Sequence, residues 1–179
     1  MIPYQDFLEL CRQRRSIRYF SDQPVSEDDV RKLLDVAHMA PSVENTQPWH
    51  FHVVRNKDLL KHLMESSCYG NFIEGAGVCI IVTYDAHIPS TTKETIWNPK
   101  ELEYSCAAAV THLLLGAVTL GLGGTWVSLH HGPAHDLLHL QPHQRVVAGV
   151  MLGHLKRGEE HATGEHQRRP VKEMFTVHG

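Results

Sequence analysis

The chain has 179 residues, with 17 Lys and Arg against 20 Asp and Glu, so its formal net charge is −3 with His neutral. Hydrophobic residues make up 42% of the chain and charged residues 21%, which is ordinary globular usage and excludes a disordered chain or a fibrous repeat. A charge this close to zero argues against a nucleic-acid binder, which normally carries a basic face.

Length, apolar runs and cysteine spacing predict the number of domains and the location of the protein. About 100–200 residues per domain predicts a single domain over residues 1–179. No apolar run approaches the ~20 residues that span a bilayer, and Met1 to Asp6 lacks the features of a signal peptide. The cysteines are far apart and form no CxxC pair, which excludes a disulfide framework and a zinc ribbon: Cys11, Cys68, Cys79 and Cys106. We therefore expect a cytoplasmic protein that does not enter the membrane.

Apolar periodicity and turn residues predict the elements in chain order. Helices are expected at 4–14, from an N-cap at Ser26 to Pro41, at 59–66, 101–120 and 134–140. Strands or extended segments are expected at 49–54, 77–84, 125–129, 145–152 and 171–177. The connections vary in length, and no GxGxxG or GxxxxGK[ST] motif follows a strand, so no Rossmann or P-loop site is predicted. The fold reads as α+β, a small sheet covered by helices.

Two arginine clusters lie near the ends of the chain. The first consists of Arg14, Arg15 and Arg18 around Ser16, and the second is the pair Arg168 and Arg169. The planar guanidinium fork is well suited to bind phosphate, although the first cluster alone could be a solvated helix end. One small anionic ligand could bring the two clusters together.

A polar loop joins the second predicted helix to the first strand. It contains Pro41, Ser42, Asn45 and Gln47, whose side chains offer donors and acceptors suited to a ring with carbonyl and N–H edges. Ordinary turn chemistry is the alternative interpretation.

Four blocks occur in a recognisable order. They are the run from Arg14 to Phe20, the run from Ala40 to Trp49, the run from Gly121 to Trp126, and Arg168 to Pro170. In order and spacing they resemble the nitroreductase family of flavoenzymes from near residue 12 to near residue 177. Within the long helix the chain departs from that pattern, with Ser105 and His112 where members often carry Asp and Asn.

The resemblance implies a nitroreductase-like α/β sandwich with a mostly antiparallel central sheet flanked by helices. It also implies a homodimer with one FMN per subunit at the interface. Residue by residue, it assigns the FMN phosphate and part of the ring to Arg14, Arg15, Ser16 and Arg18, with Arg168 and Arg169 also reaching phosphate. The loop residues Pro41, Ser42, Asn45 and Gln47 would reach the flavin of the partner subunit. Gly123 and Gly124 would form a turn whose bare backbone runs beside the ring.

The activity implied is that of an FMN-dependent oxidoreductase. NADH or NADPH would reduce the flavin, which would then reduce a nitroaromatic, quinone or similar small-molecule acceptor by a ping-pong mechanism. No side chain need act as nucleophile, so no catalytic residue is assigned. Other flavin chemistry on the same fold (dehalogenation, enone reduction or flavin fragmentation) and a flavin- or heme-binding sensor without turnover remain alternatives.

Histidine is unusually frequent, with 15 residues. The series His130, His131, His135, His139 and His143 includes a pair, His135 and His139, whose spacing on a helix could chelate a metal. No HExxH arrangement or nearby Cys supports this, so we expect surface or interface histidines. We further expect Trp49, Cys79 and Cys106 in the core. Substrate-side positions are assigned to Tyr69, Phe72 and the surface loop 86–100, which contains Trp97.

Overall fold

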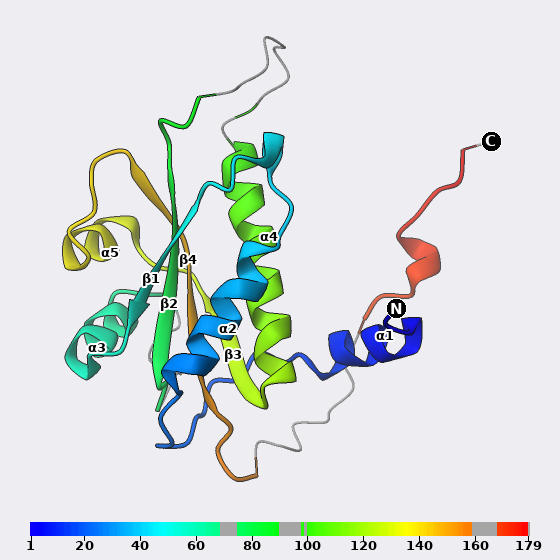
Figure 1. Ribbon diagram of the computed structural model, residues 1–179, viewed down its shortest axis with the longest axis horizontal. Coiled ribbons are helices and arrows are strands. Elements are labelled where there is room, and N and C mark those ends of the chain that lie inside the picture. The colour runs from blue at the N-terminus through cyan, green and yellow to red at the C-terminus, as the bar shows by residue number, and fades with distance from the viewer. Residues whose placement is uncertain (69–74, 90–97, 99, 159–167, 179) are drawn as a thin grey trace.

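The computed structural model describes residues 1–68, 75–89, 98, 100–158 and 168–178 (Figure 1). The helices are α1 (Tyr4–Gln13), α2 (Glu27–His38), α3 (Lys57–Glu65), α4 (Lys100–Thr119) and α5 (His131–Leu137). The strands are β1 (Trp49–Val54), β2 (Val78–Asp85), β3 (Leu122–Val127) and β4 (Gln144–His154). Two 3-10 turns, η1 (Val43–Asn45) and η4 (Val171–Glu173), complete the described elements.

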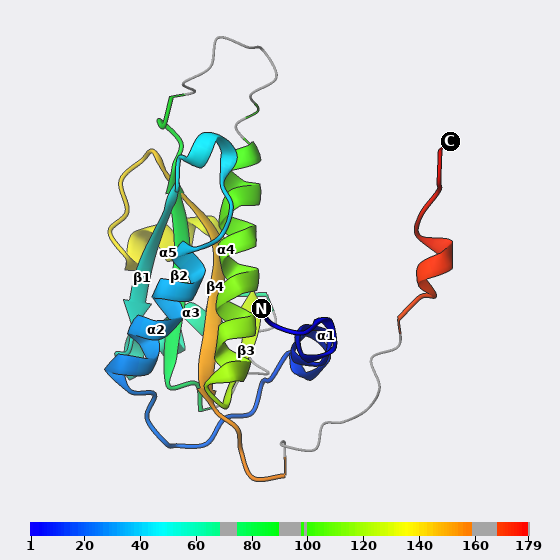
Figure 2. The same cartoon turned by 45° about the vertical axis from the view of Figure 1, so that its right-hand side comes forward.

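The four strands form one sheet in the order β1-β2-β4-β3, and all three pairings are antiparallel. Helices α2 and α4 cover one face of the sheet, while α3 and α5 cover the other (Figure 2). Each face has its own apolar core. This three-layer arrangement confirms the predicted α/β sandwich.

Strand β2 lies inside the sheet and is buried on both faces. Its side chains alternate between the two cores: Val78, Ile80 and Val82 meet the α2–α4 layer, while Cys79 and Ile81 meet the α3–α5 layer. A strand covered on both sides needs a continuous apolar run, which is the pattern that predicted it. Trp49 on β1 is 9% exposed, which confirms its expected place in the core.

Helix α2 begins where its capping residues predict. The side chain of Ser26 accepts a hydrogen bond from the backbone N–H of Asp29 at 2.9 Å, and acidic residues fill the first turn. The helix ends at His38, before the predicted stop at Pro41.

Helix α4 is the long core helix. In contrast to the expectation from the sequence, it is long and apolar enough, by length and composition, to cross a membrane, with a mean hydropathy of 1.3. Half of that stretch is buried against the sheet and α2. Such burial is what the core helix of a layered fold requires.

Two predicted elements differ from the structure. The extended segment expected at 125–129 begins earlier, so Gly123 and Gly124 lie within β3, and the turn before it is made by Gly121 with φ 69°. The strand expected at 171–177 is wrong. Its residues form η4 and an irregular segment, and no strand pairing involving them occurs among the described residues, where their apolar side chains are exposed.

Helix α1 and residues 168–178 lie to one side of the layered body in both Figure 1 and Figure 2. None of the residues of α1 is buried. Exposed apolar side chains occur on both segments, including Phe7 at 51% and Phe175 at 62%.

Candidate functional site

The first arginine cluster is carried by a segment that runs along the edge of the sheet. Ser16 forms a parallel bridge with Gly124 on β3, and the N–H of Ile17 donates to the carbonyl of Gly124 at 3.1 Å. Further on, the N–H of Ser21 donates to the carbonyl of His154 at 2.9 Å. The structure therefore brings the first and third sequence blocks side by side.

Two glycines make room for this segment. Gly123 and Gly153 face each other across β3 and β4. A Cβ at Gly123 would lie 2.9 Å from the Cβ of Ile17, and one at Gly153 would lie 2.8 Å from the Cδ1 of Phe20. Ile17 and Phe20 are 6% and 4% exposed, so they pack closely on bare backbone. The turn expected at Gly123 and Gly124 is corrected to a strand against which the arginine-bearing segment packs.

The residues around Ile17 are more open. Ser16 and Arg18 are exposed, whereas Arg14 and Arg15 are half-buried. Neighbouring side chains of an extended segment point to opposite sides, so burying Ile17 turns Ser16 and Arg18 outward. The structure thus presents a hydroxyl and guanidinium groups at one edge of the sheet.

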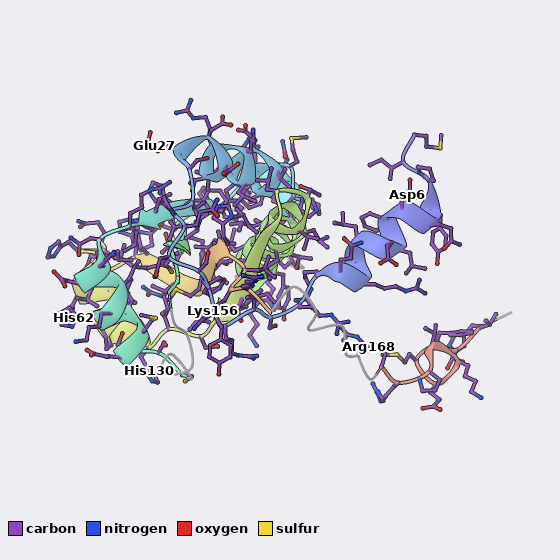
Figure 3. All side chains as sticks on the ribbon, turned by 90° about the horizontal axis from the view of Figure 1, so that it is seen from below. Asp6, Glu27, His62, His130, Lys156 and Arg168 are labelled. Atoms are coloured by element: carbon purple, nitrogen blue, oxygen red, sulfur yellow. The ribbon has the colours of Figure 1, made fainter. Side chains whose placement is uncertain are left out.

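Arg168 and Arg169 are exposed on the C-terminal segment. Figure 3 shows Arg168 well beyond the sheet, on the side where α1 lies. The second arginine cluster therefore extends away from the layered body of this chain instead of joining a pocket inside it.

The polar loop before β1 is a tightly hydrogen-bonded turn. The Oγ of Ser42 accepts from the N–H of Gln47 at 3.0 Å, and the Nε2 of Gln47 donates to the carbonyl of Asn45 at 3.1 Å. Glu44, Asn45 and Gln47 all have positive φ, at 48°, 53° and 47°. Three non-glycine residues in the left-handed region within one loop store conformational strain, which in proteins is common at functional sites.

Helix α4 is hydrogen-bonded to this loop through one buried side chain. The hydroxyl of Ser105 accepts a hydrogen bond from the N–H of Val43 at 3.1 Å and donates to the carbonyl of Glu101 at 2.6 Å. Ser105 is 5% exposed. From the sequence, Ser105 stood out only as a departure from the family pattern and was not predicted to be a site residue. The available signal was a hydroxyl inside an otherwise apolar stretch of helix.

An open depression of about 520 Å³ lies beside the loop. It is lined by residues of α2, the loop and β1: Leu34, Asp35, His38, Gln47, Trp49, His50 and Phe51. The indole N–H of Trp49 donates to the Nδ1 of His38 at 3.4 Å. The depression therefore combines aromatic walls with a few polar groups, which suits a flat, partly polar molecule.

The arginine segment and the polar loop lie at opposite edges of the sheet. The loop leads into β1, whereas the arginine segment pairs with β3, and the strand order puts β2 and β4 between them. Three strand spacings amount to about 14 Å. Within one chain, the polar loop and the arginine segment therefore flank the sheet and do not adjoin one another.

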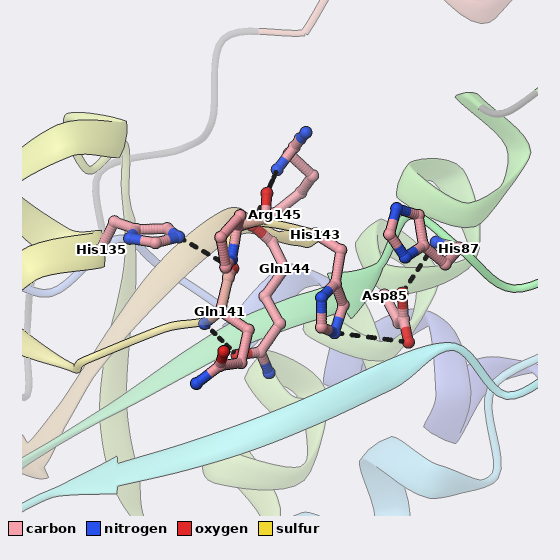
Figure 4. Close-up of polar contacts among 8 residues, drawn as sticks. Asp85, His87, His135, Gln141, His143, Gln144 and Arg145 are labelled. Carbon is pink, nitrogen blue, oxygen red and sulfur yellow. Dashed lines mark hydrogen bonds and ion pairs between the residues drawn. The ribbon is translucent and has the colours of Figure 1, made fainter.

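The histidine series does not form the chelating pair considered from the sequence. Helix α5 ends at Leu137, so His135 and His139 do not share a helix face, and His139 sits in a turn with φ 51°. Figure 4 shows the Nε2 of His135 bonded to the carbonyl of Gln141 at 2.9 Å. It also shows the Nε2 of His143 3.8 Å from the Oδ2 of Asp85. Over the described ranges, no three His, Cys, Asp or Glu residues converge on a possible metal position.

The four cysteines differ in burial, and Cys11 on α1 is half-buried. Cys79 and Cys106 are fully buried, as predicted, and burial raises the pKa of each thiol to about 12. They are inert protonated thiols at neutral pH. Cys68 is exposed, with its Sγ 3.9 Å from the Nε2 of His130. The substrate-side candidates Tyr69, Phe72 and Trp97 fall outside the described residues.

Comparison with known proteins extends this picture. Residues 11–68 and 64–154 match the model of the Nitroreductase family. A protein from Archaeoglobus fulgidus, assigned as an NADH dehydrogenase/NAD(P)H nitroreductase, is 36% identical over 126 residues, covering 70% of this chain and 69% of that protein. A Methanothermobacter thermautotrophicus protein with the same assignment is 37% identical over 129 residues, covering 72% of this chain and 64% of its own length.

A solved structure covers nearly the whole chain. It is a Desulfovibrio desulfuricans protein assigned as a nitroreductase and crystallised in complex with FMN. It is 32% identical to this chain, covers 96% of each chain and has a TM-score of 0.78.

Proposed function

Because the chain belongs to the nitroreductase family and is therefore an FMN-dependent NAD(P)H oxidoreductase, we propose that its acceptors are conjugated small molecules such as nitroaromatics and quinones. The observation that carries FMN binding is the packing of the arginine-bearing segment against Gly124, and the aromatic-lined depression beside the polar loop supports a flat acceptor. The packing supports an anion site at the edge of the sheet. We also propose that residues 1–179 form one domain.

The donor set fits the FMN phosphate. Arg14, Arg15 and Arg18 supply guanidinium groups, and Ser16 supplies a hydroxyl beside them. A phosphate dianion is matched by charged and neutral donors of this kind, and charge-assisted hydrogen bonds are the stronger ones. In this proposal Arg168 and Arg169 add positive charge from the C-terminal segment.

The polar loop fits the edge of the flavin ring. Ser42, Asn45 and Gln47 carry donors and acceptors on a backbone already held in its strained shape. A pre-shaped loop loses little conformational freedom when it binds, which favours affinity. Pro41 directly precedes this loop, while the backbone of Gly123 and Gly124 borders the arginine segment at Ile17 and Ser16.

When bound, FMN supplies the hydride chemistry between the nicotinamide donor and the acceptor. The chain's own residues bind the phosphate, orient the ring and exclude water, and we assign none of them as acid, base or nucleophile. Donor and acceptor would occupy the same face of the ring in turn, as a ping-pong mechanism requires.

The placement of the two groups supports a shared site. The arginine segment and the loop lie at opposite edges of one sheet, so a second chain would bring its loop to the first chain's arginine segment. We propose a homodimer with FMN at the interface.

The test begins with colour. Purified protein should be yellow, with an absorbance band near ~450 nm from bound flavin. It should oxidise NADH or NADPH only when an acceptor is present, assayed against nitroaromatics, quinones, enones and halogenated aromatics. Turnover confined to enones or halogenated compounds would identify other flavin chemistry on this fold. Colourless protein that FMN cannot reconstitute would contradict the proposal, and a Soret band without NAD(P)H oxidation would support a heme-binding sensor.

A further inference from the structure

The loop from Ser42 to Gln47 keeps an unfavourable backbone. Residues Glu44, Asn45 and Gln47 have φ of 48°, 53° and 47°. A non-glycine residue in such a region costs of the order of a kcal/mol and persists only where its surroundings enforce it. Something in the structure must therefore hold this loop.

Part of the restraint is local. The Oγ of Ser42 accepts from the N–H of Gln47 at 3.0 Å, and the Oγ1 of Thr46 donates to the carbonyl of Val43 at 2.8 Å. These bonds close the turn on itself. They do not fix the turn relative to the rest of the molecule.

Ser105 provides a link to a rigid element. Its hydroxyl accepts from the N–H of Val43, 62 residues earlier in the chain, at 3.1 Å. The same hydroxyl donates to the carbonyl of Glu101 at 2.6 Å, so its proton is directed into the helix and its lone pair faces the loop. Ser105 is 5% exposed and Val43 is half-buried, so water has little access to the hydroxyl and cannot readily replace it as the acceptor.

We propose that Ser105 is a positioning residue for flavin recognition, holding the loop through the N–H of Val43 so that Ser42, Asn45 and Gln47 are presented in a fixed arrangement. This inference rests on the proposed function, because it assumes that the loop contacts FMN. Ser105 itself does not touch the cofactor in this scheme.

The test compares Ser105→Ala with a matched control on the same helix. Thr111→Ala removes a hydroxyl that makes the same kind of bond, to the carbonyl of Ala107 at 3.0 Å, but that is exposed and bonds no loop. Alanine is the best helix former, so neither change should disrupt α4. We expect the dissociation constant of FMN to rise about tenfold in Ser105→Ala, as for one lost buried hydrogen bond, and to stay unchanged in Thr111→Ala.

A second variant removes the same bond from the other side. Val43→Pro deletes the donor N–H, and the backbone of Ser42, at φ −139° and ψ 152°, suits a following proline. A double variant combines Ser105→Ala with Val43→Pro. If the hydrogen bond between Val43 and Ser105 positions the loop, this double variant should bind FMN no more weakly than Ser105→Ala alone, because the two changes remove one interaction. Val43→Pro alone carries the test if Ser105→Ala does not fold.

The outcomes separate the two proposals. Wild-type protein that binds no FMN overturns the proposed function, and this inference with it. Wild-type protein that binds FMN while Ser105→Ala binds equally well overturns the role of Ser105 alone. A lower melting temperature with an unchanged FMN dissociation constant means that Ser105 is only structural. Independent, additive losses in the double variant also contradict the positioning role.

Discussion

Gly123 shows how a single missing methyl group sets the position of a binding segment. Its Cα lies beneath the branched side chain of Ile17, and an added Cβ would approach the Cβ of Ile17 to 2.9 Å. That carbon is close to the backbone and cannot swing away. The register of Ser16 and Arg18 against β3 therefore depends on glycine at this position.

We expect Gly123→Ala to displace the arginine segment, lowering the free energy of unfolding by about 1–3 kcal/mol and weakening FMN binding. The measurements are urea denaturation and FMN titration. Gly132→Ala is the matched control, because nothing lies within 4 Å of its added Cβ and the position is helical. Equal effects of the two substitutions would show that the space over Gly123 is not limiting.

Arginine side chains at the phosphate site should matter for binding more than for folding. We expect Arg14→Ala and Arg168→Ala each to weaken FMN binding roughly tenfold to a hundredfold, since a charged hydrogen bond contributes about 1.5–3 kcal/mol. The free energy of unfolding of the apoprotein should change little. Arg12→Ala serves as control, because its ion pair with Glu9 is exposed and 3.9 Å long. If Arg14→Ala or Arg168→Ala retains stoichiometric FMN through dialysis, the replaced arginine is not a phosphate ligand.

His52 gives the fold a dependence on pH. Its ring meets the hydroxyl of Thr83 at 3.1 Å, and burial, with a smaller contribution from His50, lowers the pKa of His52 below 6.5. In the unfolded chain His52 therefore becomes protonated near pH ~6.5, whereas in the folded chain it stays neutral until the pH is lower. Stability should fall as the pH drops below that value and level off once the folded form also protonates.

The check is urea denaturation between pH 8 and pH 5 on wild-type protein and on His52→Gln. Glutamine can still bond the hydroxyl of Thr83 but does not titrate. Its unfolding free energy should decline less steeply below pH ~6.5 than that of the wild type. Parallel curves would assign the acid sensitivity to other histidines.

Among the helices and strands, the sequence predicted those features that depend on a local residue pattern. The buried run of β2 and the Ser26 cap of α2 appear as expected, because a two-sided strand and an N-cap are encoded in adjacent residues. The start of β3 was missed because Gly123 and Gly124 resemble a turn. Their strand conformation is imposed by pairing with β4 on one side and with Ser16 on the other.

Long-range contacts explain the remaining differences. The hydroxyl of Ser105 meets Val43 across 62 residues, and no local pattern indicates such a partner. The apolar residues after Pro170 suggested a strand, but a strand needs a neighbour to pair with, and residues 168–178 extend away from the sheet (Figure 2). The arginines and the polar loop were identified as groups, while their separation at opposite edges depends on strand order.

Across the molecule, several apolar side chains are exposed in the part of the chain that the structure describes. No residue of helix α1 is buried, and Phe7 on its apolar side is 51% exposed. Val171 and Phe175 are 73% and 62% exposed on the C-terminal segment, and Tyr104 on α4 is 63% exposed. Apolar surface of this extent, on segments that project from the body, is typical of chains that associate.

We therefore expect an obligate twofold dimer whose sites each need both chains. Sedimentation at low micromolar concentration should give a species of twice 20.3 kDa, and FMN should stabilise it, because a ligand that binds only the assembled form favours that form by mass action. Phe7→Lys places a charge on the apolar side of α1 and should cause dissociation together with loss of FMN. Gln5→Lys, about 160° around the same helix from Phe7 and distant from Arg14, should do neither. A stable wild-type monomer that retains one FMN per chain would contradict the shared site, because its arginine segment would then hold the cofactor without a partner's loop.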